Sequence, residues 1–350
     1  MNNSFGELFR VTTFGESHGP ALGAVVDGVP AGMELDAADI QKALDRRKPG
    51  QSIFTTPRKE ADAVEILSGV FEGRTTGTPV ALLIRNQDQR SRDYGDLAEV
   101  FRPGHADYGY WKKYGIRDYR GGGRSSGRET AARVAAGAIA AKYLLEKYGI
   151  VIRAWTEAAA GISGKQVDTD FIEKNALRAA DPEMYAAMEQ AVKDAIAADD
   201  SVGGIVSCVI ENVPAGLGEP VFDKLDALLA HAMLSLGAVK GIEFGAGFAA
   251  AGMRGSENND AITPAGALTN HAGGILGGIS SGEAVNFRIA VKPTPSIRRE
   301  QQTVDKENND RTISIQGRHD PCICPRIVPV VEAMAALVLM DLVLRGGREI

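Results

Sequence analysis

Residues 119–148 read YRGGGRSSGRETAARVAAGAIAAKYLLEKY, a glycine- and arginine-rich loop followed by an alanine-rich segment. The three glycines at 121–123 allow the backbone to take positive φ angles and to approach another group closely. Ser126 and Glu129 have the spacing of a capping box, which predicts a helix over about 127–148. Because Ala, Leu and Val surround most of this helix, we expect it to lie deep in the core.

The start of this helix is also a predicted anion site. Free backbone amides at a helix N-terminus attract negative charge, and Arg120, Arg124 and Arg128 lie beside them. A guanidinium can bind a phosphate or a carboxylate through two parallel hydrogen bonds. A flexible loop with solvated arginines is the alternative, but the density of glycine and arginine directly before a capped helix favours anion binding.

Two further loops each place a histidine next to a glycine. His18 lies in the sequence FGESHGP, between apolar runs at 8–14 and 22–26 that predict a β-hairpin, and His105 lies in FRPGHADY. An imidazole suits proton transfer near neutral pH. Either histidine alone could equally be a solvated side chain. Together with the arginine-rich loop, they favour one site for an anionic ligand.

The rest of the chain alternates predicted strands and helices. Strands are expected at residues 64–71, 79–84, 151–155, 204–213, 240–248 and 284–291. Helices are expected after Asp36, in a polar insert at about 165–200, at 221–236 and after Pro329, with loops at 86–96, 271–278 and 292–326. These elements predict an α+β fold, with residues 1–350 forming one domain.

An internal similarity suggests a duplicated βα unit. VDGVPAGM at 26–33 resembles IENVPAGL at 210–217, and each predicts a strand, a Val-Pro-Ala-Gly turn and a helix. Turns can reuse proline and glycine by chance. The helix that follows each turn favours a duplication, with a core in which two similar halves pack together.

Composition limits the possible classes of function. The net charge of −6 does not favour nucleic acid or an acidic membrane as a partner. The basic loops are then local islands of positive potential, as an anionic small molecule requires. The apolar stretch at 327–344 is interrupted by Pro329, Glu332 and Asp341, which predicts a buried helix rather than a membrane span.

Cysteine usage and the N-terminal sequence predict a cytoplasmic protein without a metal. Cys208, Cys322 and Cys324 do not have the spacing of a zinc ribbon, which favours reduced thiols. The N-terminus lacks the charged region and apolar run of a secretion signal.

The motifs resemble the chorismate synthase family. The matching segments are FRVTTFGESHG at 9–19, RPGHAD at 102–107, the loop and helix start at 120–136, and GRHDP at 317–321. Four long matches make the resemblance specific, and they spread over essentially the whole chain. It implies a β-α-β sandwich of layered sheets and helices, a homotetramer, and a carbon–oxygen lyase of the shikimate pathway.

The implied reaction converts 5-enolpyruvylshikimate 3-phosphate to chorismate and phosphate. It is an anti 1,4-elimination that requires reduced FMN without net oxidation. The departing hydrogen is not acidic, so the flavin supplies electron density. The resemblance implies that His18 protonates the leaving phosphate, that His105 protonates the reduced flavin near N1, and that Asp320 moves a proton at N5.

The resemblance also implies the binding residues. A substrate with one phosphate and two carboxylates suits arginines, because a guanidinium is permanently charged and bidentate. The implied substrate contacts are Arg46, Arg47, Arg58, Arg102 and Arg128. The implied flavin contacts are Arg124, Ser125, Ser126, Gly237, Ala238, Gly277, Lys292, Pro293, Thr294, Pro295, Ser296 and Arg318. His319 is interpreted as a turn residue, and His231 and His271 are assigned no chemistry.

Two positions depart from the family pattern. Ile53 stands where many members have an arginine, which disfavours a direct NADPH contact. NADPH is therefore expected only as an indirect reductant, through an external flavin reductase. Gly237 stands where asparagine is usual, so one flavin hydrogen bond is either missing or made by the backbone.

The residues disfavour three other functions. A flavin-dependent oxidoreductase would need a nicotinamide or quinone site, and no G-x-G-x-x-G follows a predicted strand. A zinc hydrolase would need H-x-x-x-H or C-x-x-C spacing, which the sequence lacks. A non-catalytic module that binds anions or RNA is disfavoured for RNA by the overall acidity, and it would lack flavin absorbance.

Overall fold

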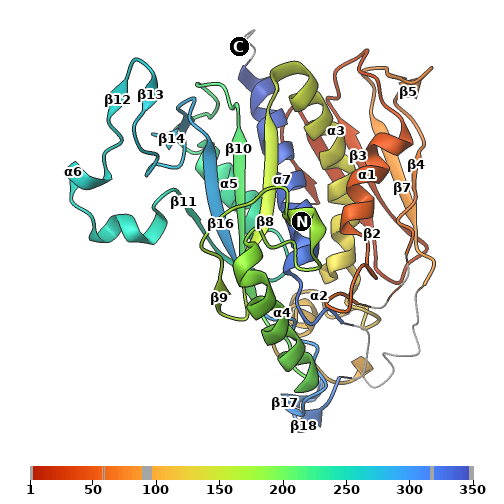
Figure 1. Cartoon of the computed structure of the whole chain (residues 1–350). Helices are drawn as coiled ribbons and strands as arrows, with labels where there is room; N and C mark the ends of the chain where they lie inside the picture. Colours follow the sequence, from red (N-terminus) through yellow and green to blue (C-terminus); the bar gives the residue numbers. More distant parts are fainter. Residues whose placement is uncertain (1–2, 57, 59, 89–96, 316–318, 347–350) are drawn as a thin grey trace.

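A computed structural model describes residues 3–56, 58, 60–88, 97–315 and 319–346. In this part of the chain, long helices lie between two five-stranded antiparallel sheets (Figure 1). The predicted α+β fold class is confirmed.

The first sheet carries the N-terminal strands. In spatial order they are β1 (Ser4–Phe5), β2 (Arg10–Gly15), β3 (Ala21–Asp27), β7 (Val80–Arg85) and β4 (Val64–Ile66). Side chains alternate between the two faces of a strand, so every second apolar residue reaches the core. Leu22 faces Ile84 across β3 and β7, and both are buried. β2 and β3 form the predicted hairpin around the His18 loop.

The second sheet carries strands from the middle of the chain. In spatial order they are β11 (Val239–Phe244), β16 (Val285–Val291), β10 (Gly204–Glu211), β8 (Val151–Ala159) and β9 (Ile162–Ser163). Cys208 faces Phe287 across β10 and β16, and both are buried. The two sheets share one strand order. In the first sheet the neighbours run β2, β3, β7, β4, and in the second they run β8, β10, β16, β11. In each set the third strand in the chain lies at the end and the fourth lies beside the second.

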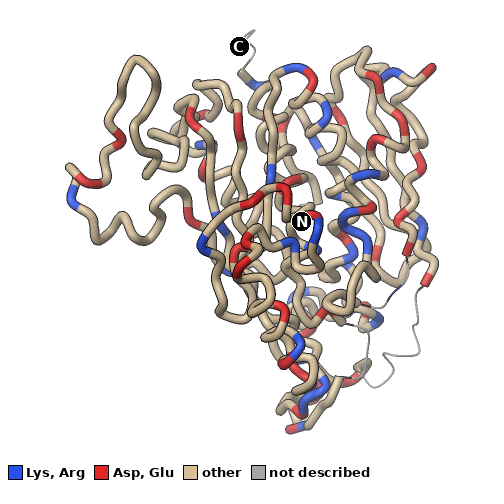
Figure 2. Tube along the Cα trace, in the orientation of Figure 1, with Lys and Arg blue, Asp and Glu red and all other residues tan. Residues whose placement is uncertain are grey.

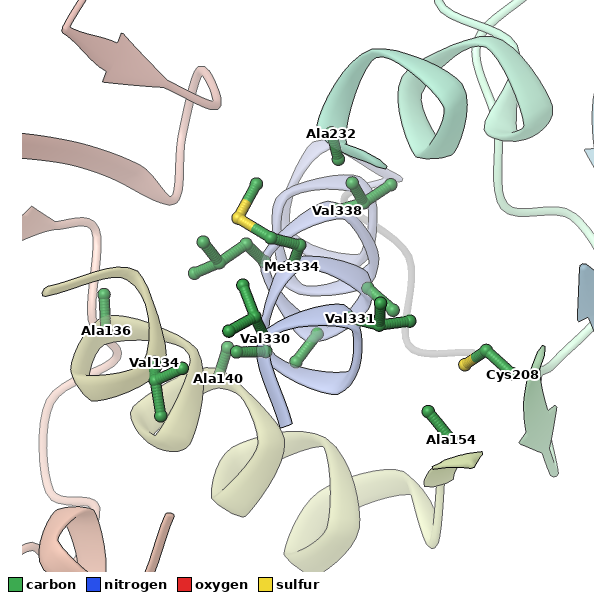
Figure 3. Close-up of a cluster of buried hydrophobic side chains, with 14 of the residues drawn as sticks. Val134, Ala136, Ala140, Ala154, Cys208, Ala232, Val330, Val331, Met334 and Val338 are labelled. Carbon is green, nitrogen blue, oxygen red and sulfur yellow. The ribbon is translucent and has the colours of Figure 1, made fainter. Parts of the chain in front are cut away.

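The helices between the sheets are α1 (Ala37–Arg47), α3 (Thr130–Tyr148), α5 (Leu225–Leu234) and α7 (Cys324–Gly346). α3 packs on the first sheet and on α7, which also contacts the second sheet and α5. Figure 3 shows this core, with Ala140 of α3 near Val330 of α7. A Cβ placed on Gly137 would lie 2.5 Å from the Ala333 Cβ. The expected deep position of the alanine-rich helix is confirmed.

α7 is long and apolar enough to cross a membrane, yet 89% of its most apolar window is buried inside the protein. The predicted buried helix is confirmed, but it begins at Cys324 and not after Pro329. A proline inside a helix removes the hydrogen bond to the carbonyl four residues earlier, here that of Pro325. The Arg178 guanidinium donates to this carbonyl instead, so the helix can continue through Pro329.

The start of α3 differs from the predicted capping box. Gly127–Glu129 form a short 3-10 turn, η3, before α3. Ser126 Oγ accepts a hydrogen bond from the Arg128 amide at 3.4 Å, and the Glu129 carboxylate binds Arg133 at 3.0 Å. Because a hydrogen bond between two charged groups is stronger than one to a neutral amide, the arginine holds this carboxylate away from the helix end.

The predicted strand at 64–71 is interrupted. Gly69 has a φ of 81°, a left-handed conformation that an extended strand cannot contain. The chain therefore leaves β4 and forms a small hairpin of β5 (Val70–Phe71) and β6 (Arg74–Thr75).

Two other predicted strands end early for the same reason. The strand expected at 240–248 stops before Gly245, and the one expected at 204–213 stops before Asn212, where φ is 53° and 61°. The helix expected from residue 221 begins at Leu225.

The structure also contains elements that were not predicted. α2 (Asp107–Tyr114) is short and contains Gly109, so it lacks a clear apolar period. The expected loop at 292–326 contains the hairpin of β17 (Gln301–Val304) and β18 (Asp310–Ile313).

Two segments lie at the periphery. The predicted insert contains η4 (Ile172–Lys174) and α4 (Pro182–Ala197). An arm between β11 and β16 extends away from the sheets in Figure 1. The arm contains η5 (Gly247–Gly252), α6 (Gly255–Asn258), β12 (Ile262–Thr263) and β13 (Gly266–Ala267), and the small hairpin of β14 (Ile275–Leu276) and β15 (Ile279–Ser280) follows it.

Candidate functional site

One cavity collects the three predicted catalytic residues. It has a volume of about 520 Å³ and is lined by loops from both sheets and by the start of α7. His18 comes from the β2–β3 loop, His105 from the segment before α2, and Asp320 from the segment before α7. Residues far apart in the sequence therefore line a common space.

The glycine-rich loop passes beside both histidines. Gly121, Gly122 and Gly123 all have positive φ angles, as the sequence predicted. A side chain on Gly121 would overlap the His18 ring, and a Cβ on Gly122 would lie 3.0 Å from His105 Cε1. The loop thus makes room for the two imidazoles as well as for a ligand.

Hydrogen bonds within the His18 loop and from Asn86 hold the loop in place. His18 Nδ1 lies 3.0 Å from Ser17 Oγ, and both residues are buried. The Asn86 amide, which follows β7, donates to the carbonyls of Glu16 at 3.0 Å and Gly19 at 2.7 Å. These two bonds fix the backbone on both sides of the histidine.

His105 belongs to a buried charged cluster around Asp107. Arg102 binds the Asp107 carboxylate through two hydrogen bonds of 2.6 and 2.9 Å, and Arg117 lies 3.4 Å away. His105 Nδ1 is 3.0 Å from Asp107 Oδ1. Burial alone would raise the Asp107 pKa, but the Arg102 and His105 hydrogen bonds hold it well below its usual range.

The same burial acts on His105 in the opposite direction. It lowers the pKa of the imidazole, an effect that the Asp107 hydrogen bond only partly offsets and that the Arg102 charge reinforces. Without a ligand, His105 is therefore mainly neutral at pH 7.

Arginines paired with carboxylates form part of the cavity wall, which we call the arginine wall. Asp62 binds Arg128 at 2.6 Å, and Glu60 binds Arg58 at 2.6 Å. Arg47 also binds Asp62, at 3.1 Å, with all its side chain buried. Burial raises the Asp62 pKa, but the two guanidinium charges outweigh it and lower the pKa. Of the predicted substrate contacts, Arg58, Arg102 and Arg128 line the cavity.

Asp320 is fixed by two neighbours. The Thr56 amide donates to Asp320 Oδ1 at 2.8 Å, and Arg326 of α7 donates to Oδ2 at 2.7 Å. His319 lines the cavity, and its Nε2 has no hydrogen-bond partner among the described residues. Burial, reinforced by the Arg102 charge, lowers the His319 pKa to about 4. The sequence suggested only a turn residue at His319, and it did not indicate that this side chain lines the cavity.

Most of the predicted flavin contacts line the same cavity. These are Ser125, Ser126, Gly237, Ala238, Lys292, Thr294, Pro295 and Ser296. Thr294 Oγ1 is buried and has no hydrogen-bond partner among the described residues. The unpartnered hydroxyl and the unpartnered His319 ring nitrogen leave polar capacity for a bound molecule.

A second pocket, of about 440 Å³, adjoins the cavity and shares Ser125, Ser126 and Gly237 with it. Two predicted site residues line only this pocket. Arg47 donates to the Gly127 carbonyl at 2.5 Å, and Arg124 donates to Thr13 Oγ1 at 2.7 Å and to the Gly15 carbonyl at 3.1 Å.

Other predicted residues lie outside both pockets. Arg46 pairs with Glu173 at 2.7 Å and with Glu332, so it connects α1 to the insert and to α7. Ile53, which departs from the family pattern, is 68% exposed and lines neither pocket.

Two of the predicted flavin contacts do not line the cavity, and a third lies outside the described residues. Pro293 does not line it although its neighbours do. Gly277 lies at the exposed turn between β14 and β15. Arg318 is not among the residues that the structure describes.

Sequence reasoning missed two cationic residues of the cavity, Lys240 and Arg326. Arg326 had a usable signal, because it follows the matched segment GRHDP by a few residues at the start of an apolar helix. Lys240 had none, since it was placed inside a predicted strand.

Charges of both signs are interspersed over the described chain (Figure 2). This view shows Lys and Arg alternating with Asp and Glu, whereas a nucleic-acid surface would require a continuous basic face. Among the described residues, no three His, Cys, Asp or Glu side chains are grouped as metal ligands. The cavity therefore combines proton-transfer groups with local anion-binding groups.

The sequence profile described as chorismate synthase matches residues 9–344. The chain belongs to the chorismate synthase family. Its reaction is accordingly the elimination of phosphate from 5-enolpyruvylshikimate 3-phosphate to give chorismate, a lyase step of the shikimate pathway.

Known members of the family agree over nearly the full length. The chorismate synthase of Azoarcus sp. (strain BH72) is 58% identical over 343 residues, covering 98% of this chain and 91% of that protein. That of Syntrophus aciditrophicus (strain SB) is 58% identical over 347 residues, covering 98% of each. A crystal structure of chorismate synthase is similar with a TM-score of 0.76 at 32% identity, covering 98% of this chain and 93% of that one.

Proposed function

We propose that the 520 Å³ cavity is the active site, with His18, His105 and Asp320 as its proton-transfer groups. The observation that supports this most is that all three meet in one cavity with Arg58 and Arg128, although they come from distant segments. His18 would donate a proton to the leaving phosphate, and Asp320 would accept or hold one on the side of Arg326.

The arginine wall would bind the phosphate and carboxylates of the substrate. Arg58 and Arg128 are already paired with Glu60 and Asp62, which fixes each guanidinium in one position. A fixed donor needs little reorganisation when charge develops on the departing phosphate. Asp62 and Glu60 therefore act as positioning residues for this wall.

Reduced FMN would be held by the predicted flavin contacts that line the cavity. The hydroxyls of Ser125, Ser126 and Thr294 and the Lys292 ammonium provide polar groups for a phosphate and a ring system, and Thr294 Oγ1 lacks a protein partner among the described residues. When bound, reduced FMN supplies electron density for the elimination. Ser125, Ser126, Ala238 and the segment from Lys292 to Ser296 would hold it.

The protonation of His105 would depend on what the cavity holds. Burial keeps its pKa below the ordinary value of 6.5 in the ligand-free protein. A negative charge beside the imidazole favours its charged form and raises the pKa. His105 would then carry a proton only when an anionic ligand is close enough to receive it.

An anaerobic assay tests these roles. The protein with FMN, dithionite and 5-enolpyruvylshikimate 3-phosphate should release phosphate, and His18→Ala or His105→Ala should lower the rate by about 10²–10⁴. His271→Ala is the control, because His271 lines neither pocket. Two histidine variants with the full wild-type rate would contradict the assigned roles.

We also propose that NADPH acts only indirectly, through a separate flavin reductase. At the position where many family members have an arginine, Ile53 offers an exposed apolar side chain with no charge for a nucleotide phosphate. Turnover with NADPH in place of dithionite, under anaerobic conditions and without an added reductase, would contradict this.

A homotetramer, a single domain and a cytoplasmic location are further proposals. Large apolar side chains on the arm support self-association: Phe248 is 85% exposed and Ile262 is 83% exposed. One cluster of buried apolar residues reaches from Phe9 to Val343, which supports a single domain. Three buried free cysteines support a reducing compartment.

We further propose that the fold is the family's β-α-β sandwich and that it arose from a duplicated unit. The two Val-Pro-Ala-Gly turns support this in atomic detail. Thr75 Oγ1 donates to the Pro30 carbonyl at 2.6 Å and accepts from the Met33 amide at 3.0 Å. In the second half, Ser280 Oγ donates to the Pro214 carbonyl at 2.6 Å and accepts from the Leu217 amide at 2.8 Å. Thr75 closes the β5–β6 hairpin before β7, and Ser280 closes the β14–β15 hairpin before β16.

A further inference from the structure

We propose that Arg178 is a positioning residue for the active site, although it belongs to the insert and lines neither pocket. Its guanidinium contacts two chain segments, and each of these segments donates a hydrogen bond to the Asp320 carboxylate. The inference rests on the proposed function, which makes Asp320 a proton-transfer group of the cavity.

The first of the two segments is the start of α7. Arg178 Nη1 donates to the Pro325 carbonyl, which has no helical partner because Pro329 lacks an amide hydrogen. The next residue, Arg326, donates to Asp320 Oδ2 at 2.7 Å. The Arg178 contact therefore fixes the backbone directly beside the arginine that binds Asp320.

The second segment follows α1. Arg178 Nη2 donates to Gln51 Oε1 at 3.1 Å, and the Gln51 side-chain amide donates to two carbonyls at the end of α1. Five residues after Gln51, the Thr56 amide donates to Asp320 Oδ1 at 2.8 Å. Arg178 thus joins the two segments that supply these hydrogen bonds to Asp320.

The backbone of Arg178 is held in an unusual conformation. Its φ is 52°, in the left-handed region that residues other than glycine rarely adopt. The Thr156 amide donates to the Arg178 carbonyl at 2.8 Å, and the Asn175 side chain binds the amide and the carbonyl of Ala179 at 2.9 and 2.8 Å. A strained residue that its surroundings hold in place points to a functional role.

The chemistry of arginine suits this role. Arg178 is buried, and its Nε lies 3.3 Å from both carboxylate oxygens of Glu173, which balances the charge. A guanidinium presents its donors in fixed directions, so one side chain can hold acceptors on three segments at once. Without it, the two segments that bind Asp320 could move independently, and a shift of about 1 Å at a catalytic group can cost about 10²-fold in rate.

The test compares full-length variants in the anaerobic assay, with kcat, the substrate KM and the melting temperature measured for each. Arg178→Met should lower kcat about 10- to 100-fold. The substrate KM should stay within about twofold, because Arg178 is not part of the arginine wall. A residue that only stabilises the fold would lower the melting temperature and leave the kcat of the folded enzyme unchanged.

Arg178→Lys keeps a positive charge beside Glu173 and provides the measurement if the methionine variant does not fold. A single ammonium cannot reproduce the fork that holds both the Pro325 carbonyl and Gln51, so kcat should still fall about threefold or more.

Two double variants test whether the effect passes through Asp320. Pro329→Ala restores an amide that can donate to the Pro325 carbonyl, so it should raise kcat about threefold or more in the Arg178→Met background and change little alone. Asp320→Asn should lower kcat by itself, and adding Arg178→Met should cause no further loss, because both changes act on one carboxylate.

Arg153→Met is the control, because Arg153 of β8 also binds a carboxylate, that of Glu211, but lines neither pocket. Its kcat should stay within about twofold of the wild-type value.

Unchanged kcat in folded Arg178→Met and Arg178→Lys would overturn the inference. So would losses that multiply with that of Asp320→Asn, or no recovery with Pro329→Ala. In each case a slow Asp320→Asn variant would still support the proposed function. An Asp320→Asn variant with the full wild-type rate would overturn the proposed role of Asp320 and this inference with it.

Discussion

His319 is a half-buried imidazole whose pKa lies below its usual range. Its pKa is lowered to about 4, because burial disfavours the charged ring and the nearby Arg102 is also positive. The unfolded chain binds this proton more readily than the folded one. Its contribution to stability is therefore complete above about pH 6.5 and is lost as the pH falls towards 4.

We expect His319→Asn to flatten the acid side of the stability profile. Between pH 7.5 and 5, the wild-type imidazole should lower the free energy of unfolding by roughly 2 kcal/mol, at about 1.4 kcal/mol per pH unit. His105 acts in the same direction and remains in the variant. Urea titrations of the ligand-free protein at the two pH values measure the difference.

The control is His271→Asn, since His271 lies in the glycine-dense loop near Asp260. If His319→Asn and the wild-type protein lose equal stability between the two pH values, the imidazole is not the neutral, half-buried group described above.

Local sequence indicated that His18 and His105 belong to one site, since each lies beside a glycine in a loop. The structure places both histidines at one cavity, while their catalytic roles stay predictions. Arg46 was not separable from Arg47, since adjacent arginines on α1 differ only in the direction in which they leave the helix. Lys240 could not be predicted, because it lies at a β-bulge between β11 and β16, and a bulge depends on how two distant strands pair.

At the scale of elements, the contact between α3 and α7 organises the core. Gly137 allows the two helices to approach closely, since a Cβ there would lie 2.5 Å from the Ala333 Cβ and 2.7 Å from its carbonyl oxygen. Backbone atoms cannot move aside as a flexible side chain can. The helices would have to separate to accept even one methyl group.

Gly137→Ala should therefore destabilise the protein by about 1–3 kcal/mol, although alanine is the better helix former. Gly109→Ala in α2 is the matched control, because a Cβ there meets nothing within 4 Å. It should be neutral or stabilising by up to about 1 kcal/mol. Thermal unfolding of both variants gives the comparison, and a gain in stability for Gly137→Ala would contradict the described packing.

Element boundaries were predictable where local chemistry decides them. The β2–β3 hairpin and α3 follow from apolar periodicity and a terminal glycine. The start of α7 could not be predicted, because the hydrogen bond lost at Pro329 is replaced by Arg178, more than a hundred residues earlier. The capping box failed for a similar reason, since Arg133 takes the Glu129 carboxylate.

At the scale of the molecule, the arm exposes large apolar side chains that the packing of a single chain does not explain. Phe248, Ile262 and Leu268 are 85, 83 and 72% exposed, and the arm extends from the body (Figure 1). A surface of this kind is typical of a contact between subunits.

The double variant Phe248→Asp, Ile262→Asp should shift the protein from a tetramer to smaller species, because a buried unpaired charge is costly at an interface. Sedimentation velocity measures the shift. Glu34→Ala with Lys42→Ala, on exposed positions of the first half, is a control for general surface changes. A double arm variant that sediments like the wild-type protein would exclude the arm from the interface.

α7 packs between the two sheets, contacts α3 and carries Arg326 to the cavity, and it follows every strand of both five-stranded sheets in the described chain. A ribosome-bound chain therefore cannot complete the interior of either half until α7 has been synthesised. Until then, the apolar side of α3 faces water or a chaperone. Chains that stop before α7 would lack both Arg326 and the helix that fills the space between the sheets, and we expect cellular proteases to degrade them.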